Sequence, residues 1–256
     1  MQDVLFPCKP GKFVIISTPR TGSNLLRTLL DSHPEIVCHS ELFSKDAIYY
    51  SYQYGHEWIS GYTKAKRDSD PVQFLNFIYG TKLKETCHAI GFKILNEQND
   101  TVLNQLIKDK TIKKIILKRE NVLMSYLSFL ELQKTGKALA KDNNDIYKTG
   151  DSLKITVDFH EFDNYKKQID LFYSKIISIL NETSQGFFLI KYTDLLNRRK
   201  ITEILSFINV ESTNQQIFSN LQKQNQRDLC ERIANYSEFV NELKKGGYEN
   251  LLQKEL

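Results

Sequence analysis

Short apolar runs that alternate with longer amphipathic stretches are the feature of this sequence that most constrains its fold. Each run lies beside turn-forming or polar residues, as buried strands do. The runs occupy Phe13–Ser17, Ala89–Leu95, Lys113–Lys118 and Gly186–Lys191. Because strands separated by helices pair in parallel and are covered on both faces, the pattern predicts an α/β fold with three layers and a mainly parallel central sheet.

Helical periodicity fills the segments between the apolar runs and most of the chain after them. The predicted helices are Asn24–Ser32, Pro71–Tyr79, Asp100–Lys108, Asn121–Lys134 and Glu161–Asn181, followed by 194–210, 214–224 and 230–245. The polar segment Lys137–Thr156 has little periodicity and is interpreted as a loop or lid. With no linker or repeat, we expect one domain over 1–256, with the C-terminal helices packed onto the sheet.

Composition excludes several classes of protein. A net charge of +4 is too weak to indicate nucleic-acid binding. Four widely spaced cysteines without a CxxC pair favour neither a disulfide framework nor a zinc site, so we expect a reducing compartment, the cytoplasm. No apolar run is long enough to span a membrane, and the N-terminus lacks the pattern of a signal peptide.

The first apolar run leads through the polar turn STPRTGSN into a leucine-rich helix. The first turn of a helix has unpaired N–H groups and a positive dipole end, which together bind anions. Gly22 permits close approach, Arg20 contributes a planar charged fork, and hydroxyls come from Thr18, Thr21 and Ser23.

This turn allows two other interpretations. One is an ordinary strand–turn–helix junction with Ser23 or Asn24 as the N-cap. The other is a P-loop nucleotide kinase or related phosphotransferase, which is disfavoured because no lysine follows Gly22 and GxxxxGK[ST] is absent.

A second stretch, KKIILKRENVLMSYLSFLELQKTG, repeats the layout of strand, turn and helix. Arg119 lies at the predicted carboxyl end of the strand, where ligands collect in open α/β sheets. Ser128 lies on the following helix, with Ser125 three residues earlier on roughly the same face, and Gly136 suits the end of that helix.

Together these stretches resemble the sulfotransferases that use 3′-phosphoadenosine 5′-phosphosulfate (PAPS), and more closely their bacterial carbohydrate-type branch, which includes trehalose sulfotransferase relatives. TPRTGSNLL is similar to the 5′-phosphosulfate loop of that branch, and LKRENVLMSYLSFLELQKTG to its 3′-phosphate motif. Smaller similarities lie in CHSELF, IGFKIL, IKYTDLL and SFINV. The resemblance implies a P-loop-like fold, a metal-independent in-line transfer of a sulfuryl group to a hydroxyl, and release of adenosine 3′,5′-bisphosphate (PAP).

The resemblance also implies roles for individual residues. Arg20 neutralises charge on the bridging oxygen, and Arg119 with Ser128 binds the 3′-phosphate, Ser125 being the alternative to Ser128. Residues expected to hold the 5′-phosphosulfate are Thr18, Pro19, Arg20, Thr21, Gly22, Ser23 and Asn24.

Glu41 in CHSELF matches the glutamate proposed as the base in this branch, and His39 is the rival base. If the segment is extended, both side chains share one face. The structural alternatives are that Glu41 caps a helix and that His39 lies at the surface.

Lys93, near the end of its strand, either contacts acceptor or sulfonate or is solvated. Lys223, Gln224 and Arg227 form a basic cluster that either closes over the 3′-phosphate or is charged surface. An aromatic-rich segment around Trp58 suits a sugar or lipid acceptor.

The expected partners are therefore a glycan, a glycolipid or another small hydroxylated acceptor, and a homodimer is possible. The alternative to an enzyme is a non-catalytic nucleotide-binding relative that keeps the fold.

Overall fold

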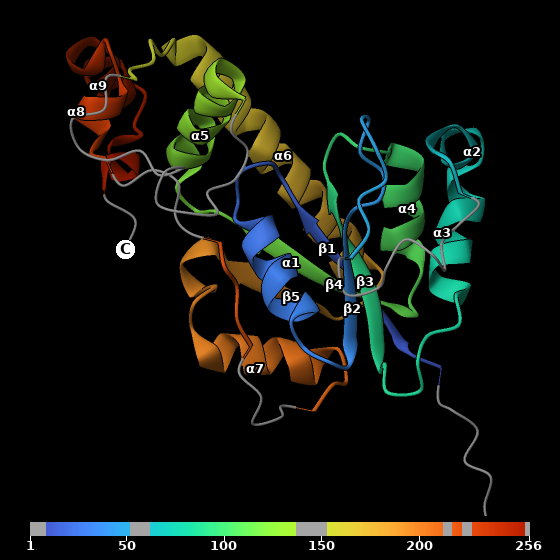
Figure 1. Ribbon diagram of the computed structural model, residues 1–256. Coiled ribbons are helices and arrows are strands. Elements are labelled where there is room, and N and C mark those ends of the chain that lie inside the picture. Colours follow the sequence, from blue (N-terminus) through green and yellow to red (C-terminus); the bar gives the residue numbers. More distant parts are fainter. Residues whose placement is uncertain (1–8, 52–61, 137–152, 212–216, 222–226, 254–256) are drawn as a thin grey trace, which may run out of the picture. The chain divides into compact units, whose positions relative to one another are not determined.

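The computed structural model describes residues 9–51, 62–136, 153–211, 217–221 and 227–253. These residues form two compact units (Figure 1). Unit 1 takes its residues from 1–18, 22–118 and 176–219, and unit 2 from 19–21, 119–175 and 220–256. The single domain expected from the sequence stays a prediction.

Unit 1 is built around a five-stranded sheet in which every strand pair is parallel. The strand order is β2-β3-β1-β4-β5. The strands are β1 (Gly11–Ser17), β2 (Ile36–Glu41), β3 (Ala89–Leu95), β4 (Ile112–Lys118) and β5 (Phe187–Lys191). The predicted α/β fold is therefore confirmed. The edge strand β2 was not predicted, because its sequence IVCHSE is short and half polar.

The helices of unit 1 are α1 (Ser23–Asp31), α2 (Lys64–Ser69), α3 (Pro71–Gly80), α4 (Asp100–Lys108) and α7 (Arg198–Phe207), with the short η3 (Tyr192–Asp194). Of these, α1, α3 and α4 follow the predicted boundaries within one residue, whereas α7 is shorter than the helix predicted over 194–210. Helix α2 was not predicted. The long α6 (Phe159–Glu182) contributes residues to both units.

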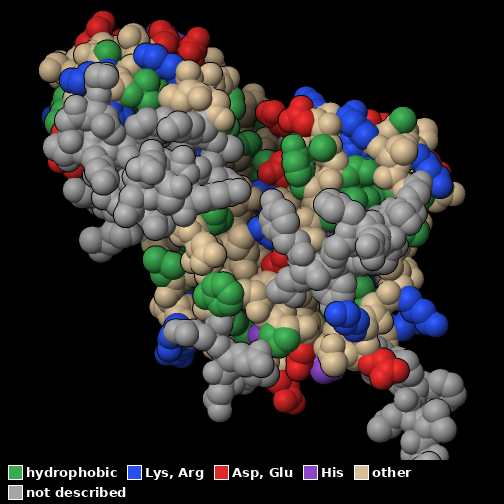
Figure 2. Space-filling view, in the orientation of Figure 1, with side chains coloured by type: hydrophobic (Ala, Val, Ile, Leu, Met, Phe, Trp, Pro, Cys, Tyr) green, Lys and Arg blue, Asp and Glu red, His purple; other side chains and the backbone are tan. Residues whose placement is uncertain are grey.

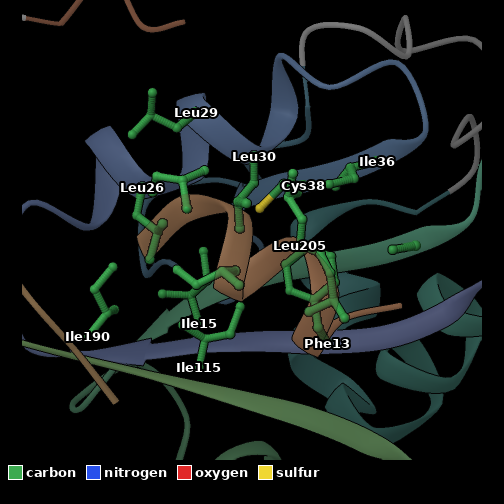
Figure 3. Packing of buried hydrophobic residues seen from close by; sticks show 14 of the residues in the cluster. Phe13, Ile15, Leu26, Leu29, Leu30, Ile36, Cys38, Ile115, Ile190 and Leu205 are labelled. Atoms are coloured by element: carbon green, nitrogen blue, oxygen red, sulfur yellow. The ribbon is translucent and has the colours of Figure 1, made fainter. Parts of the chain in front are cut away.

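Helices α1 and α7 cover one face of the sheet in unit 1. Leu26 and Leu30 from α1, Leu205 from α7, and Phe13 and Ile15 from β1 belong to one buried cluster (Figure 3). On the opposite face, the ring of Phe92 packs against Phe43 and against Tyr79 of α3. The carboxyl ends of the strands are thus held by cores on both faces.

Unit 2 is helical and has its own hydrophobic cluster. Its elements, besides the first part of α6, are α5 (Val122–Thr135), α8 (Leu229–Arg232), α9 (Tyr236–Lys245) and η4 (Glu249–Leu252). Leu127 of α5, Phe162 of α6 and Phe239 of α9 are buried together. As predicted, α5 ends at Gly136, which adopts a left-handed φ of 69°.

Two C-terminal predictions are wrong. The helix expected over 230–245 is interrupted, because Ile233 leaves the helix and pairs with Ile155 in an isolated β-bridge. Residues 217–221 of the helix expected over 214–224 are not helical. Helix α7 does pack onto the sheet, whereas α8 and α9 belong to unit 2.

Candidate functional site

The loop after β1 leads into α1, whose N-terminus has no side-chain cap. The N-cap of α1 is Gly22, in place of the Ser23 or Asn24 of the ordinary-junction interpretation. Gly22 has a left-handed φ of 84°, and a Cβ there would lie 2.7 Å from side-chain atoms of both Leu195 and Tyr192. The first turn carries no acidic residue. A glycine is therefore required here, and the N–H groups of the first turn meet no carboxylate from their own helix.

The hydroxyl-bearing residues of the loop are buried. Thr18 and Thr21 are each 1% exposed and Ser23 is 5% exposed. Their side chains therefore lie within the folded units instead of pointing into bulk solvent. Pro19 and Arg20 are partly exposed.

Arg20 is joined to both predicted residues of the second motif within unit 2. Its φ of 62° is unusual for a residue with a side chain. Arg119 Nη1 donates to the carbonyl oxygen of Arg20 at 3.0 Å, and Arg20 Nε donates to Ser128 Oγ at 2.9 Å. Ser125 Oγ makes a longer contact of 3.5 Å with the same carbonyl oxygen. Residues 99 to 108 positions apart in sequence are thus brought into one group.

Glu41 belongs to a second group of polar side chains, in unit 1. Its Oε1 lies 2.7 Å from Lys93 Nζ, and its Oε2 accepts a hydrogen bond of 2.6 Å from Gln98 Nε2. Lys93 Nζ also donates to Asn24 Oδ1 at 2.5 Å. Lys93 is 1% exposed, so the interpretation of a solvated lysine is wrong. Sequence reasoning missed Gln98, although its place just after β3 is a signal for a strand-end polar residue.

A β-bulge places His39 and Glu41 on opposite faces of the sheet. His39 pairs with Phe92, and Glu41 pairs with Lys93, the next residue of β3. Ser40 is the extra residue in between. Because neighbouring residues of a strand point to opposite faces, the prediction that both side chains share one face is wrong.

His39 is fully buried and engaged with the backbone. Its Nδ1 accepts a hydrogen bond of 3.0 Å from the N–H of Ser51. Burial, with a smaller effect of the nearby Arg27 charge, lowers the pKa of His39 to about 3. The ring is therefore neutral at physiological pH, and the interpretation of a surface histidine is wrong.

A buried carboxylate on α1 anchors the segment that follows β2. Asp31 accepts hydrogen bonds from the N–H of Cys38 at 3.0 Å and from Ser51 Oγ at 2.7 Å, and it pairs with Arg27 at 3.1 Å. Burial raises the pKa of Asp31, and these partners oppose that rise. The network holds β2 and Ser51 against α1.

The predicted basic cluster is only partly described. Lys223 and Gln224 lie outside the described residues, as do Trp58 and most of Lys137–Thr156. Arg227 has a side chain with 0% exposure, donates to the carbonyl of Leu153 at 2.6 Å and lies 3.5 Å from Glu131. For Arg227, the interpretation as charged surface is therefore wrong.

Charges of both signs are interspersed on the face that Figure 2 presents, in keeping with the small net charge. Within the described part of the chain, no helix combines the length and the apolar character needed to cross a bilayer. The described cysteines, Cys38, Cys87 and Cys230, are free thiols.

Comparisons with known proteins fit this arrangement. Residues 11–106 match the model of the sulfotransferase family. Nodulation protein H of Rhizobium tropici is 24% identical over 251 residues, covering 95% of this chain and 94% of that protein. The Rhizobium meliloti (strain 1021) protein of the same name is 22% identical, with coverages of 95% and 96%.

Among solved structures, a sulfotransferase from Alicyclobacillus acidocaldarius aligns over 97% of this chain and 98% of its own, with a TM-score of 0.50 and 14% identity. This likeness shows the fold. The family match includes Arg20, Glu41, Lys93 and Gln98 and ends before Arg119.

Proposed function

Since this chain belongs to the sulfotransferase family, we propose that it moves a sulfuryl group from PAPS to a hydroxyl of a carbohydrate or glycolipid acceptor. The observation that carries the proposal is the bonded group of Arg20, Arg119 and Ser128. In it, the residue expected at the breaking S–O bond contacts both residues expected at the 3′-phosphate.

The donor requires positive charge and N–H donors at two places. At the 5′ end, the uncapped start of α1 provides N–H groups and a positive dipole end, and Arg20 supplies a guanidinium. Arg20 stabilises negative charge that develops on the leaving phosphate oxygen, by analogy with phosphoryl transfer. Thr18, Pro19, Thr21, Ser23 and Asn24 complete the loop.

At the 3′ end, Arg119 contributes a permanent charge and Ser128 a hydroxyl. The bond from Arg20 uses Ser128 Oγ as an acceptor, and a hydroxyl in this role still has its own O–H to donate to a phosphate oxygen. Ser125 makes the longer contact, so we assign the 3′-phosphate to Ser128 in preference to Ser125. Recognition of this second phosphate separates PAPS from ATP.

Glu41 is the base that removes the proton of the acceptor hydroxyl. A general base must come within hydrogen-bond reach of the proton it takes. The side chain of Glu41 is 24% exposed, whereas His39 is fully buried and its Nδ1 already accepts from Ser51. A carboxylate has about four acceptor sites, so the bonds to Lys93 and Gln98 leave capacity for a hydroxyl proton.

The acceptor class is supported by the sequence segment around Trp58, whose aromatic side chains suit the faces of sugar rings. We also propose that the protein works in the cytoplasm, where its free thiols stay reduced.

Isothermal titration in EDTA tests the donor assignment. We expect PAP to bind without Mg²⁺ and much more tightly than adenosine 5′-monophosphate, which lacks the 3′-phosphate. In a parallel titration without EDTA, binding of ATP with Mg²⁺ and no binding of PAP would show a P-loop phosphotransferase instead.

Transfer itself is measured with ³⁵S-labelled donor and a panel of neutral oligosaccharides and glycolipids. Glu41→Gln is expected to lose transfer while still binding PAP. A wild type that binds PAP and labels no acceptor in the panel would contradict the proposed acceptor class. A Glu41→Gln variant that transfers at the wild-type rate would exclude Glu41 as the base.

A further inference from the structure

A buried lysine in the middle of the sheet needs an explanation that fold stability does not supply. Lys93 lies on β3, where it pairs with Ile15 of β1 and Glu41 of β2. Burial of an ammonium group is costly unless it is paired, and a hydrophobic residue of similar size is often as stabilising. The ammonium of Lys93 lies 2.7 Å from Glu41 Oε1 and donates to Asn24 Oδ1 at 2.5 Å.

Gln98 fixes the other oxygen of the same carboxylate. Its Oε1 accepts from the N–H of Leu95 at 3.1 Å, and its Nε2 donates to Glu41 Oε2 at 2.6 Å. A backbone N–H is only a donor, so the amide must turn its oxygen toward Leu95 and its NH₂ toward the carboxylate. The turn is closed by a further bond from the N–H of Gln98 to the carbonyl of Leu95 at 3.2 Å.

We propose that Lys93 and Gln98 are positioning residues that clamp the Glu41 carboxylate, one on each oxygen, in the orientation and ionised form that proton removal requires. The inference rests on the proposed function, in which Glu41 is the base. During transfer the proton passes from the acceptor hydroxyl to a Glu41 oxygen, and Lys93 and Gln98 keep their own protons.

The clamp also reaches the donor side of the reaction. Asn24, which accepts a hydrogen bond from Lys93, is the second residue of α1. The N-terminus of this helix is the place proposed to hold the phosphosulfate. One buried ammonium thus contacts both the base and the donor helix. Burial lowers the pKa of Lys93, Arg27 of α1 acts in the same direction, and Glu41 and Cys38 of β2 oppose it.

Kinetics of Gln98→Glu provide the first test. The change keeps the size of the side chain and replaces the donor by a second carboxylate beside Glu41. Two adjacent carboxylates resist joint ionisation, so the acid limb of the pH–kcat profile should move to higher pH. We expect kcat near neutral pH to fall on the order of tenfold, a part of what a general base contributes.

Glu97→Gln is the matched control, because it alters an exposed charge one residue away and should leave the profile unchanged. Lys93→Met should move the acid limb in the same direction as Gln98→Glu, because it removes the cation that favours an ionised carboxylate. PAP affinity and the melting temperature report whether each variant has folded. An acid limb unmoved in both Gln98→Glu and Lys93→Met, with folding intact, would overturn the inference.

A cross-linking experiment tests the clamp without any acceptor. A water-soluble carbodiimide activates the Glu41 carboxylate, Lys93 Nζ attacks it, and an isopeptide bond forms. One carboxylate oxygen leaves in the urea, which takes up two protons, and the lysine ammonium gives up two of its three protons. Mass spectrometry should find the Glu41–Lys93 cross-link in the wild type and a several-fold lower yield in Gln98→Ala.

The exposed pair Lys64–Asp68, at 2.8 Å, is the internal reference, whose yield should not change. An unchanged Glu41–Lys93 yield in Gln98→Ala refutes the role of Gln98 whether or not transfer is detected. A lowered yield in a protein that transfers no sulfate would leave the clamp standing and reject the proposed function alone.

Discussion

Arg20 combines an unusual left-handed backbone conformation with the side chain that we propose to act in the transfer. A residue with a Cβ pays on the order of 1–3 kcal/mol for a sparsely populated backbone conformation, unless its surroundings hold it there. Here the carbonyl of Arg20 is held by Arg119 and its side chain by Ser128. Strain of this kind collects at functional sites, where it fixes the direction in which a charge points.

Arg20→Ala should lower kcat by about 10²–10³-fold, as removal of one transition-state charge donor does elsewhere. Initial rates at saturating ³⁵S-labelled donor measure the effect. Arg199→Ala is the matched control, because the Arg199 side chain is 88% exposed. Equal rates for both variants would remove Arg20 from the mechanism.

His39 is expected to make stability depend on pH. Its folded pKa of about 3 lies below the ordinary histidine pKa of 6.5, so the unfolded state binds the proton more readily. Its contribution is therefore complete above pH 6.5 and is lost as the pH falls toward 3. The slope is at most about 1.4 kcal/mol per pH unit.

Urea unfolding of the wild type and of His39→Gln, measured from pH 7.5 to 4.5, isolates this effect. The glutamine keeps an acceptor for the N–H of Ser51 but does not titrate. The difference in unfolding free energy between the two proteins should shrink as the pH falls. A constant difference across this range would contradict a buried neutral histidine.

At the scale of elements, β3 is shaped by what its neighbours place against it. Gly91 pairs with Phe13 of β1 and Cys38 of β2. A Cβ on Gly91 would lie 2.5 Å from the ring of Phe13, and Phe13 is fully buried. The close approach of the ring to β3 therefore requires glycine.

Gly91→Ala should destabilise the protein by roughly 1–3 kcal/mol through overpacking. Gly80→Ala, at the end of α3, is the matched control: a Cβ there meets nothing within 4 Å. That substitution should raise stability by about 0.4–1 kcal/mol, because alanine restricts the unfolded chain. Chemical denaturation of the two variants compares them, and a loss in both would argue against a specific clash.

At the scale of the whole molecule, each unit has its own buried charges as well as its own apolar cluster. In unit 2, Arg232 approaches Glu131 with two nitrogens, at 2.9 and 3.1 Å, and Arg227 lies 3.5 Å from the same carboxylate. One carboxylate thus serves two buried guanidinium groups. This arrangement ties α8 to α5.

Glu131→Gln should therefore destabilise the protein by about 3–5 kcal/mol, the cost of leaving a buried charge without its partner. The triple variant Glu131→Leu, Arg227→Met and Arg232→Met removes the carboxylate together with both guanidinium groups and should lose much less. Thermal unfolding of both variants makes the comparison. A triple variant as unstable as Glu131→Gln would show that packing, and not charge, dominates.

Local patterns in the sequence predicted four of the five strands and most of the helices. Short apolar strands, amphipathic helices and the glycines Gly22 and Gly136 are local patterns, and local backbone preferences suffice to produce them. For that reason the α/β fold and the two stretches that carry the family resemblance could be predicted from the sequence. The edge strand β2 could not be predicted, because the second half of its sequence IVCHSE is polar.

Tertiary structure alone decided which side chains meet. The bulge at Ser40 separates His39 from Glu41, and the neighbouring position of β2 and β3 pairs Glu41 with Lys93. The Ile155–Ile233 bridge likewise ends a helix that its local sequence favours. Such contacts depend on residues far apart in the chain, and their free energy comes from burial and pairing, which no local pattern records.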